Sequence, residues 1–485
     1  MYRLNVKKKK SIMNDRIPQL AGELATEISK ELKSDIRKLG KKTFNLGGVH
    51  PEANKFAHSA EVVTFPLPDQ AVVYMTQHLG APATPIVQKG DKVKVGQLIG
   101  EAQTFMCANI HSPISGTVNR IDMIADISGY KKPAIVIDRE GDEWDESIDT
   151  TPDIIREIKL NKEEIIARMK DRGIVGLGGA CFPTHIKYML KPEQKCEYLI
   201  VNAAECEPYI STDNRVILER TEQCLIGIEI ALIASGAEKA IIGIEDNKPR
   251  AIAALVEMCK KFTNIEVQPL KIKYPQGAEK QLIKAITGRS VPNGALPISV
   301  GCIVNNITTM YVLYQAVQKN KPIIQAYTTV SGKSLPKEQC KIFRLRIGTP
   351  IRDVLNAVGI PEDTGKIISG GPMMGKAIAN LDAYISKGMG SLLFMNEKES
   401  LRGETRPCLR CGKCVSACPM GLQPYMLHAL SDLKRYEDCE HYGIMNCIEC
   451  GCCSFSCPSF RPLVDMIRVG KAKTGAMIRA RNAAK

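Results

Sequence analysis

The sequence predicts a multidomain protein of mixed α/β and α+β class that ends in a cysteine-rich segment. The chain has 485 residues, which exceeds a single hydrophobic core and indicates three to five domains. Residues 150–318 alternate between helical and strand patterns, which is typical of a parallel sheet covered by helices. Many of the 18 cysteines are clustered after residue 396, and clustered cysteines in a cytoplasmic chain indicate metal ligands.

Composition excludes several classes of protein. The hydrophobic fraction of 44% and the charged fraction of 24% are ordinary for a soluble globular chain. No stretch approaches the roughly 18 apolar residues of a membrane span, and the longest candidate, residues 225–234, is interrupted by Glu229. Residues 1–10 are basic but lack an apolar region and a cleavage site, so we expect a cytoplasmic location.

The net charge of +14 is concentrated at the two ends of the chain. Residues 1–42 hold 12 Lys and Arg against 5 Asp and Glu, and residues 461–485 hold 7 against 1. Basic ends favour nucleic acid, anionic lipid or an acidic partner. Aromatic residues make up only 5%, and no nucleic-acid module is visible, so we expect no nucleic-acid partner.

The first element is predicted within residues 1–42. Apolar side chains recur every four positions from Leu20 to Ile36, which predicts an amphipathic helix over residues 17–40. Two interpretations stay open: the helix packs on its own domain, or it docks onto a membrane complex.

Residues 43–148 change to short strands between Gly and Pro turns. Residues 89–99 alternate apolar and polar side chains, and residues 111–118 carry a second such segment. Together they resemble the halves of a biotinyl/lipoyl-type barrel-sandwich hybrid domain. True carriers have a lysine at the hairpin tip, whereas residues 103–107 have none. We therefore expect an unmodified structural or docking module.

The next two segments are predicted as an α/β domain over residues 149–318 and a β-grasp domain over residues 319–395. In the first, helices are expected at 162–170, 215–234 and 250–262, and strands at 198–201, 240–244 and 265–272. In the second, short strands surround one helix at 351–358, with a turn-rich stretch at 369–375.

The last segment, residues 396–485, contains the motif C-x2-C-x2-C-x3-C-P twice. This spacing is that of bacterial two-cluster ferredoxins, in which the fourth cysteine binds the other cluster. Three thiolates on one tight loop reach three corners of a cubane, and the fourth points to the opposite site. We therefore predict a ferredoxin-like domain with two [4Fe–4S] clusters, the first held by Cys408, Cys411, Cys414 and Cys457, and the second by Cys447, Cys450, Cys453 and Cys418.

Zinc is the alternative metal, since its tetrathiolate sites also use C-x2-C pairs. A zinc ribbon needs neither the third cysteine three positions further on nor the following proline, and here the whole pattern is duplicated. Iron–sulfur clusters are therefore favoured. Cys439 and Cys452 fall outside the pattern and are interpreted as structural.

A glycine-rich loop at residues 173–187 follows the helix predicted to end near Arg172. Its glycines let backbone amides approach a phosphate or a flat ring, and Lys187 adds a cation. The loop follows a helix, so it is not the dinucleotide fingerprint. A tight turn is the alternative interpretation. His185 in this loop is expected at the surface or as a helix cap.

A family resemblance rests on this loop and three further stretches. The loop resembles the flavin- and NADH-binding loop of the complex I flavoprotein subunit, and residues 201–208, 274–280 and 304–308 resemble it in the same order. With the barrel, β-grasp and double-cluster segments, nearly the whole chain resembles the C subunits of the Rnf complexes, the ion-translocating ferredoxin:NAD oxidoreductases.

The resemblance implies which residues bind non-covalent FMN and the substrate NAD(H). FMN would lie against Gly176, Gly178, Lys187, Asn202, Glu205, Tyr274, Gly277, Asn305, Asn306 and Thr308. NADH would contact Phe182, Glu207 and Glu279. Two positions depart from the complex I pattern, because Ala204 and Ala278 replace acidic residues.

The resemblance also implies an activity and partners. The chain would be the peripheral electron-input subunit of a translocase at the cytoplasmic face of the bacterial membrane. It would pass electrons between NAD(H), FMN and two clusters, and assemble with the other Rnf-type subunits, including a ferredoxin-like one. Two alternatives remain. One is a cobalamin reductase-type protein with flavin and iron–sulfur clusters. The other is an electron-relay and docking subunit without flavin, an alternative that Ala204 keeps open.

Overall fold

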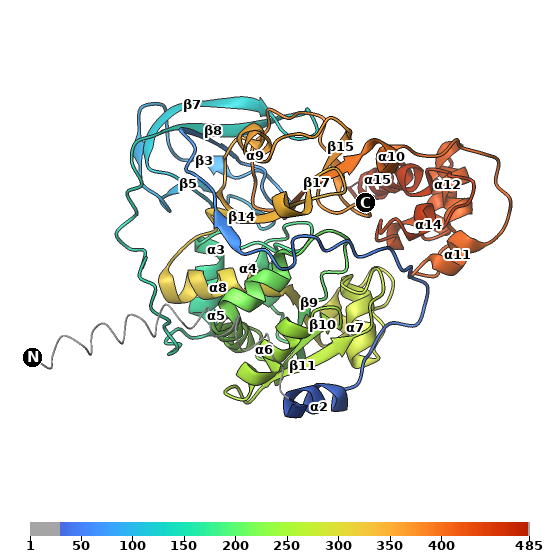
Figure 1. Cartoon of the computed structure of the whole chain (residues 1–485), viewed down its shortest axis with the longest axis horizontal. Coiled ribbons are helices and arrows are strands. Elements are labelled where there is room, and N and C mark those ends of the chain that lie inside the picture. Colours follow the sequence, from blue (N-terminus) through green and yellow to red (C-terminus); the bar gives the residue numbers. More distant parts are fainter. Residues whose placement is uncertain (1–29, 484–485) are drawn as a thin grey trace, which may run out of the picture.

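The computed structural model describes residues 30–483, which form a parallel-sheet part, two β-rich parts and a helical C-terminal part (Figure 1). The chain enters through α2 (Lys30–Lys38), which packs against α6 below the parallel sheet. A helix is predicted from the sequence over residues 17–40. Residues 17–29 lie outside the described residues, and the described part of the helix ends at Lys38.

The parallel sheet has the strand order β11-β10-β9-β12. Side chains on both faces are buried: Leu199 and Val201 pack toward α5 and α8, and Ile200 packs toward α7. This explains the nearly continuous apolar runs of these strands. The elements are β9 (Tyr198–Ala203), β10 (Lys239–Glu245), β11 (Ile265–Leu270), β12 (Cys302–Asn306), α3 (Lys162–Asp171), α4 (Thr184–Tyr188), α5 (Thr212–Ser235), α6 (Pro249–Cys259), α7 (Glu279–Thr287), the 3-10 helix Pro297–Val300 and α8 (Ile307–Lys319).

The strand order of this sheet positions the candidate site. Along the chain, β9 is followed by β10 and β11 on one side, and β12 then returns to the other side of β9. In open parallel sheets, ligands bind beyond the carboxyl ends of the strands at the point where the order reverses. That point lies here between β9 and β12.

The barrel part contains two small antiparallel sheets packed face to face. Its core includes Val73, Ile99, Ile110, Ile135 and Ile137. One sheet consists of β2 (Gln70–Tyr74), β8 (Lys131–Arg139), β7 (Gly116–Ala125) and β4 (Lys92–Val93), and the other of β3 (Thr84–Pro85), β5 (Leu98–Glu101) and β6 (Ile110–His111).

A six-stranded sheet lies beside the barrel, with the order β1-β14-β13-β17-β15-β16. Its first strand comes from the segment that precedes the barrel, because β1 pairs in parallel with β14. The elements are β1 (Val62–Thr64), β13 (Gln325–Ser331), the 3-10 helix Lys337–Gln339, β14 (Lys341–Arg346), α9 (Ile351–Val358), β15 (Thr364–Ser369), β16 (Lys376–Ala377), β17 (Ser391–Asn396) and α10 (Glu397–Ser400).

The C-terminal part, residues 401–483, contains helices and no strands. The long α15 packs on α12 and α13, and a chain without regular structure leads from α10 to α11 around the outer edge (Figure 1). The elements are α11 (Lys413–Ala417), α12 (Pro424–Asp432), α13 (Tyr436–His441), the 3-10 helix Ile444–Asn446, α14 (Cys452–Phe455) and α15 (Leu463–Ala483).

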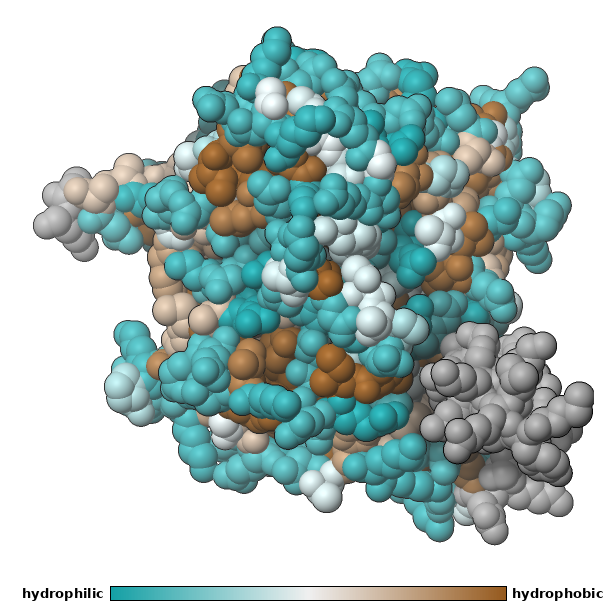
Figure 2. Space-filling view, turned by 90° about the vertical axis from the view of Figure 1, so that its left-hand side faces the viewer, coloured by the Kyte–Doolittle hydropathy of each residue, from teal (hydrophilic) through white to brown (hydrophobic). Residues whose placement is uncertain are grey.

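Two observations concern the surface. Within residues 30–483, none of the helices combines the length and the apolar character that crossing a membrane requires. Figure 2 shows one face of the molecule, which is mostly hydrophilic and interrupted by separate hydrophobic patches.

Candidate functional site

The carboxyl edge of the parallel sheet brings several of the predicted flavin-binding residues together. Asn202 at the end of β9 donates its side-chain N–H to the carbonyl of Gly277, which follows β11, at 2.8 Å. A Cβ atom at Gly277 would lie 3.2 Å from the Asn202 side chain, so a larger residue would displace this contact. Asn305 and Asn306 end the neighbouring strand β12.

The glycine loop lies over the same edge. Its ends are fixed by a hydrogen bond from the Gly176 N–H to the Phe182 carbonyl (2.9 Å) and another from the Leu177 N–H to the Thr309 hydroxyl (3.0 Å). A Cβ atom at Gly178 would come within 2.7 Å of the Asn306 side chain, so glycine permits the close approach. Residues 178–180 of the loop are exposed.

Lys187, Phe182 and Glu279 lie together beside this loop. The Lys187 ammonium donates to the carbonyl of Val304 at 2.6 Å and lies 3.5 Å from a carboxylate oxygen of Glu279. It is also 5.9 Å from the centre of the Phe182 ring. Because the Lys187 side chain remains partly exposed, the cation can reach an anionic group bound at the sheet edge.

His185 in the same loop is buried, contrary to the surface position expected from the sequence. It belongs to the short helix α4, whose inner face turns it toward the core. Burial lowers the pKa of its imidazole to about 4, so it is neutral at physiological pH.

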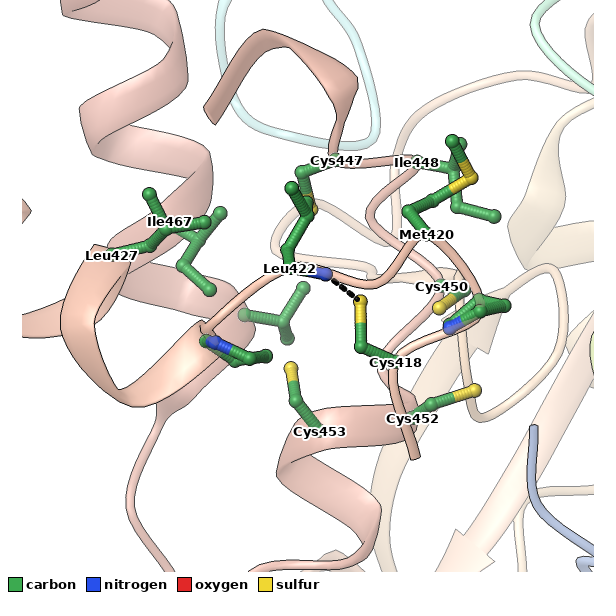
Figure 3. Close-up of a pocket in the computed structure, with 14 residues that line it drawn as sticks. Cys418, Met420, Leu422, Leu427, Cys447, Ile448, Cys450, Cys452, Cys453 and Ile467 are labelled. Carbon is green, nitrogen blue, oxygen red and sulfur yellow. Dashed lines mark hydrogen bonds between the residues drawn. The ribbon is translucent and has the colours of Figure 1, made fainter. Parts of the chain in front are cut away.

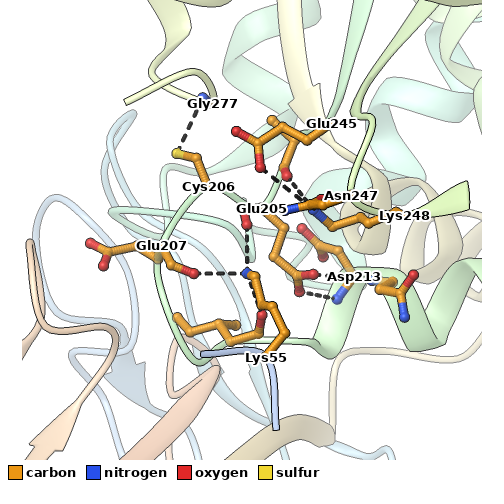
Figure 4. Close-up of polar contacts among 12 residues, drawn as sticks. Lys55, Glu205, Cys206, Glu207, Asp213, Glu245, Asn247, Lys248 and Gly277 are labelled. Atoms are coloured by element: carbon orange, nitrogen blue, oxygen red, sulfur yellow. Dashed lines mark hydrogen bonds and ion pairs between the residues drawn. The ribbon is translucent and has the colours of Figure 1, made fainter. Parts of the chain in front are cut away.

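Glu205 and Lys55 form a partly buried polar cluster at the loop that follows β9 (Figure 4). The Lys55 ammonium donates to the carbonyls of Glu205, Glu207 and Ile210 at 2.6–2.8 Å. The Glu205 carboxylate accepts the backbone N–H groups of Asp213 (2.6 Å) and Asn214 (3.4 Å) at the start of α5. Burial lowers the pKa of Lys55 and raises the pKa of Glu205. In this structure both side chains hold the loop that follows β9.

Asp213 is a residue of the site that the sequence analysis missed. Its carboxylate accepts the side-chain N–H of Asn306 at 2.7 Å and the hydroxyl of Thr308 at 2.6 Å. Asn306 also caps α8, because its side-chain oxygen accepts the Thr309 N–H. Asn305 donates instead to the Tyr188 hydroxyl at 2.6 Å. The polar Ser-Thr-Asp-Asn run at residues 211–214 was a usable signal of a helix start with a free carboxylate.

Glu207 and Tyr274 have other partners than Lys187: Glu207 contacts the loop after β15, and Tyr274 contacts the cysteine-rich part. The Glu207 carboxylate accepts the backbone N–H groups of Met373 (3.2 Å) and Met374 (2.8 Å), in the loop after β15. The Tyr274 hydroxyl donates to the Cys450 carbonyl at 2.9 Å, and the tyrosine is only 2% exposed. Tyr274 therefore joins the parallel-sheet part to the cysteine-rich part.

One set of four predicted cluster ligands lines a single apolar cavity (Figure 3). Cys418 of the first motif lines it together with Cys447, Cys450 and Cys453 of the second, and Cys452, which lies outside the motif, lines it as well. The Leu422 N–H donates to the Cys418 sulfur and the Glu449 N–H to the Cys447 sulfur, both at 3.4 Å. Amide donors of this kind stabilise thiolate ligands and raise the reduction potential of a cluster.

The other four predicted ligands are more open. Cys408 and Cys411 are exposed on the chain before α11, and Cys414 and Cys457 are half-buried against the helical core. Within residues 30–483, no three Cys, His, Asp or Glu side chains close around a point tightly enough to hold a single metal ion. Cys439 and Cys452 are fully buried.

Comparison with known proteins identifies the family. Residues 169–315 match the Nuo51 FMN-binding domain, and residues 42–142 match the RnfC barrel sandwich hybrid domain. Over 443 residues the chain is 42% identical to the C subunit of the proton-translocating ferredoxin:NAD(+) oxidoreductase complex of Clostridium ljungdahlii, and the match covers 89% of this chain and 94% of that protein. The chain belongs to the family of these C subunits.

Further relatives agree. The C subunit of the Na(+)-translocating ferredoxin:NAD(+) oxidoreductase complex of Acetobacterium woodii is 38% identical, with 90% of this chain and 98% of that protein covered. The C subunit of the ion-translocating oxidoreductase complex of Rhodobacter capsulatus is 37% identical, with 88% and 82% covered. The resemblance drawn from the glycine loop is thereby confirmed, and the segment that carries this loop is a domain of the Nuo51 FMN-binding type.

Proposed function

We propose that the chain is the electron-input subunit of an ion-translocating ferredoxin:NAD oxidoreductase, in which electrons pass between NAD(H), FMN and two [4Fe–4S] clusters. The single observation that carries this proposal is the contact between the Tyr274 hydroxyl and the Cys450 carbonyl. It joins the Nuo51-type sheet domain to the cavity that four of the predicted cluster ligands help to line. A subunit that transfers electrons between a flavin and a cluster needs the two sites close together, and this contact supports such proximity.

FMN fits the carboxyl edge of the parallel sheet. Residues 178–180 of the glycine loop are exposed there, which supports contact of their backbone with a ligand, and Lys187 supplies a positive charge for a phosphate group. Glycine at 178 and 277 lets the side chains of Asn306 and Asn202 approach the backbone closely, which brings their amide groups to this edge. Phe182 and Glu279 beside Lys187 suit the adenine and a ribose hydroxyl of NADH.

FMN, when bound, accepts two electrons from NADH as a hydride and releases them singly to clusters that carry one electron each. The protein orients the bound flavin and nicotinamide and shields their site from solvent. The hydrogen bonds from Lys55 to three carbonyls fix the loop after β9, and Asp213 holds Asn306 and Thr308 against the start of α8. No residue is required as a general acid or base.

The cysteine-rich part supports an order for the two clusters. The cavity of Cys418, Cys447, Cys450 and Cys453 adjoins Tyr274, so its cluster would lie nearer to the flavin. Cys408 and Cys411 are exposed, so the cluster of Cys408, Cys411, Cys414 and Cys457 would lie nearer to the surface. We therefore infer that electrons enter or leave the protein at the exposed cluster.

We further infer the finer domain assignment. Residues 43–148 form the barrel-sandwich domain, residues 149–318 the FMN and NADH domain, and residues 319–395 a β-grasp domain. The order β14-β13-β17-β15-β16, with β13 parallel to β17 and α9 after β14, is that of a β-grasp sheet and supports this assignment. Residues 396–485 are proposed as a two-cluster ferredoxin-like domain, whose described residues 401–483 are helical without strands, and residues 1–42 as a basic amphipathic N-terminal helix. The described part of that helix, α2, packs against α6, which supports the interpretation in which it packs on its own domain.

The partners proposed for the chain are the other subunits of the membrane-bound complex, including a ferredoxin-like subunit. Its relatives are named as subunits of such complexes. The basic residues Arg402, Arg406, Arg410 and Lys413 around the exposed cysteines support contact with an acidic electron carrier. We propose a peripheral position at the cytoplasmic face of the membrane, where NADH is available.

An anaerobic titration tests this function. The purified full-length chain should contain FMN and two clusters, and NADH should bleach the flavin absorbance and produce the electron paramagnetic resonance signal of reduced [4Fe–4S] clusters. A preparation with zinc in place of iron, or one in which NADH changes neither signal, would refute the proposal. Co-purification with membrane subunits distinguishes this function from that of a free-standing reductase.

A further inference from the structure

A second cavity lies away from the sheet edge, where the barrel meets the six-stranded sheet. It has a volume of about 520 Å³ and shares no residue with the flavin edge or the cysteine cavity. Its wall combines the link between β1 and β2, the chain after β8, the chain after α8 and the strands β13 and β14. The lining residues are Thr64, Phe65, Pro66, Leu67, Asp142, Trp144, Lys321, Gln325, Arg344 and Arg346.

Positive charge dominates this cavity. Lys321, Arg344 and Arg346 line it, against one carboxylate, Asp142. Arg344 and Arg346 stand two positions apart on β14 and therefore point to the same face of the strand. Arg346 is satisfied by protein partners, because it donates to Asp142 at 2.8 Å and 2.9 Å and to the Pro113 carbonyl at 2.6 Å.

The other two cations keep donors without partners. Within residues 30–483, the Lys321 ammonium has no hydrogen-bond or ion-pair partner and only lies over the Trp144 ring, 4.8 Å from its centre. Arg344 donates one N–H to the Thr64 hydroxyl at 2.7 Å, but its Nε is buried and without a partner. Unpaired buried donors are costly, and so are neighbouring like charges.

The electrostatic cost is visible at Lys321. Burial and the nearby guanidinium groups of Arg346, Arg344 and Arg220 lower its pKa to about 8. Perturbed ionisable groups in a cleft are typical of binding sites, because the ligand supplies the missing charge. An anion that accepts hydrogen bonds from Lys321 and Arg344 would offset both the repulsion and the unpaired donors.

We propose that this cavity, at the junction of the barrel and the six-stranded sheet, binds a small organic anion with two or more phosphate or carboxylate groups. Lys321 and Arg344 hold the charged groups. Trp144, Phe65 and Leu67 contact its carbon skeleton. The volume is within the range of small-molecule sites and larger than a single inorganic ion needs. The site is independent of the proposed electron transfer.

Isothermal titration of the full-length chain with bound cofactors tests the proposal, with citrate and inorganic pyrophosphate as probes and chloride at matched ionic strength as the reference. We expect one equivalent of citrate or pyrophosphate to bind, and which of them binds more tightly reveals the preferred charged group. Lys321→Met, which keeps the aliphatic stem over Trp144, should weaken binding about tenfold or more. Lys89→Met removes an exposed lysine of the barrel and should leave binding unchanged.

Three results would overturn the proposal. The first is that neither citrate nor pyrophosphate gives more binding heat than chloride. The second is that Lys321→Met, like Lys89→Met, binds the probes with the affinity of the wild type. The third is that NADH displaces the probe, which would assign the probe to the nicotinamide site. A titration of the assembled complex gives a fourth result that would overturn the proposal. If binding seen with the isolated chain disappears there, an acidic segment of a partner occupies the cavity, and the small-anion proposal is wrong.

Discussion

The substitution Tyr274→Phe separates two roles for one residue. The sequence motif assigns Tyr274 to the flavin pocket, whereas the structure directs its hydroxyl to the carbonyl of Cys450, at 2.9 Å. Phenylalanine keeps the buried ring and removes only the donor. The variant therefore keeps the packing of the ring, and its effect reports the loss of the hydroxyl's hydrogen bonds, the short one to the Cys450 carbonyl and a longer one of 3.5 Å to Glu207.

The magnitude follows from the burial of both partners. Tyr274 is 2% exposed and Cys450 is 8% exposed, so solvent does not replace the lost donor. Leaving a buried carbonyl without its donor costs about 1–3 kcal/mol. If that cost falls on the docked cysteine loop, local opening of residues 447–453 becomes about 5- to 150-fold more frequent.

Hydrogen–deuterium exchange with mass spectrometry measures this opening. Exchange in residues 447–453 should accelerate in Tyr274→Phe, while FMN content stays at the wild-type level. Tyr425→Phe is the matched control, because its hydroxyl donates to Gln423 on the exposed surface of the same C-terminal part. Unchanged exchange in the cysteine loop together with lost FMN would refute the structural role and restore the flavin role.

Three other changes have defined outcomes. Cys453→Ser should lower the iron content from about eight to about four atoms per chain and prevent NADH from reducing the remaining cluster. Cys411→Ser should lose the same amount of iron but keep a cluster that NADH reduces. Identical electron paramagnetic resonance spectra of the two variants after NADH addition would contradict the proposed order of the clusters. Lys187→Ala should weaken the binding of FMN by about 1.5–3 kcal/mol, measured by flavin fluorescence after dilution. The control is Lys195→Ala, which removes an exposed lysine paired with Glu238 and should not change FMN binding. Equal FMN retention in both variants would exclude Lys187 from the phosphate site. Burial lowers the pKa of Lys387 to about 7. Above that pH the unfolded state holds this proton more tightly, so Lys387 should raise the free energy of unfolding by up to about 1.4 kcal/mol per pH unit between pH 7 and 8.5. Buried Lys55 and Lys321 add slopes of the same sign, so Lys387→Met should make the slope in denaturant titrations smaller; an unchanged slope would show that Lys387 does not contribute.

Local patterns predicted much of the fold. The helix expected at residues 351–358 has those bounds in the structure, and the strands expected from residue 198 to residue 272 each lie within two residues of their observed ends. Their signals are periodic and confined to one segment. The strand β1 gave no such signal, because it has three residues and pairs with β14 about 280 residues later (Val62 with Ile342). Short strands held by distant partners are fixed by tertiary packing.

The candidate site divides in the same way. The cysteine spacing predicts that Cys418 joins the three ligands of the other motif; these four side chains and Cys452 line one cavity, so the predicted ligands lie near one another, and their binding of a cluster stays a prediction. A motif names residue types, however, and does not say which neighbours those residues face. Asn306 and Thr308 were assigned to flavin, and here both donate to Asp213, which lies almost a hundred residues earlier.

This difference has a physical origin. Hydrogen-bonding side chains at the end of a parallel strand have several possible acceptors within reach, and the choice depends on where distant elements pack. The contact between Tyr274 and Cys450 spans 176 residues and joins two parts that each have their own core. An electron-transfer protein depends on such contacts, since they set the distance between its redox sites. The residues that connect the sites are therefore the ones for which sequence motifs predict the role least well.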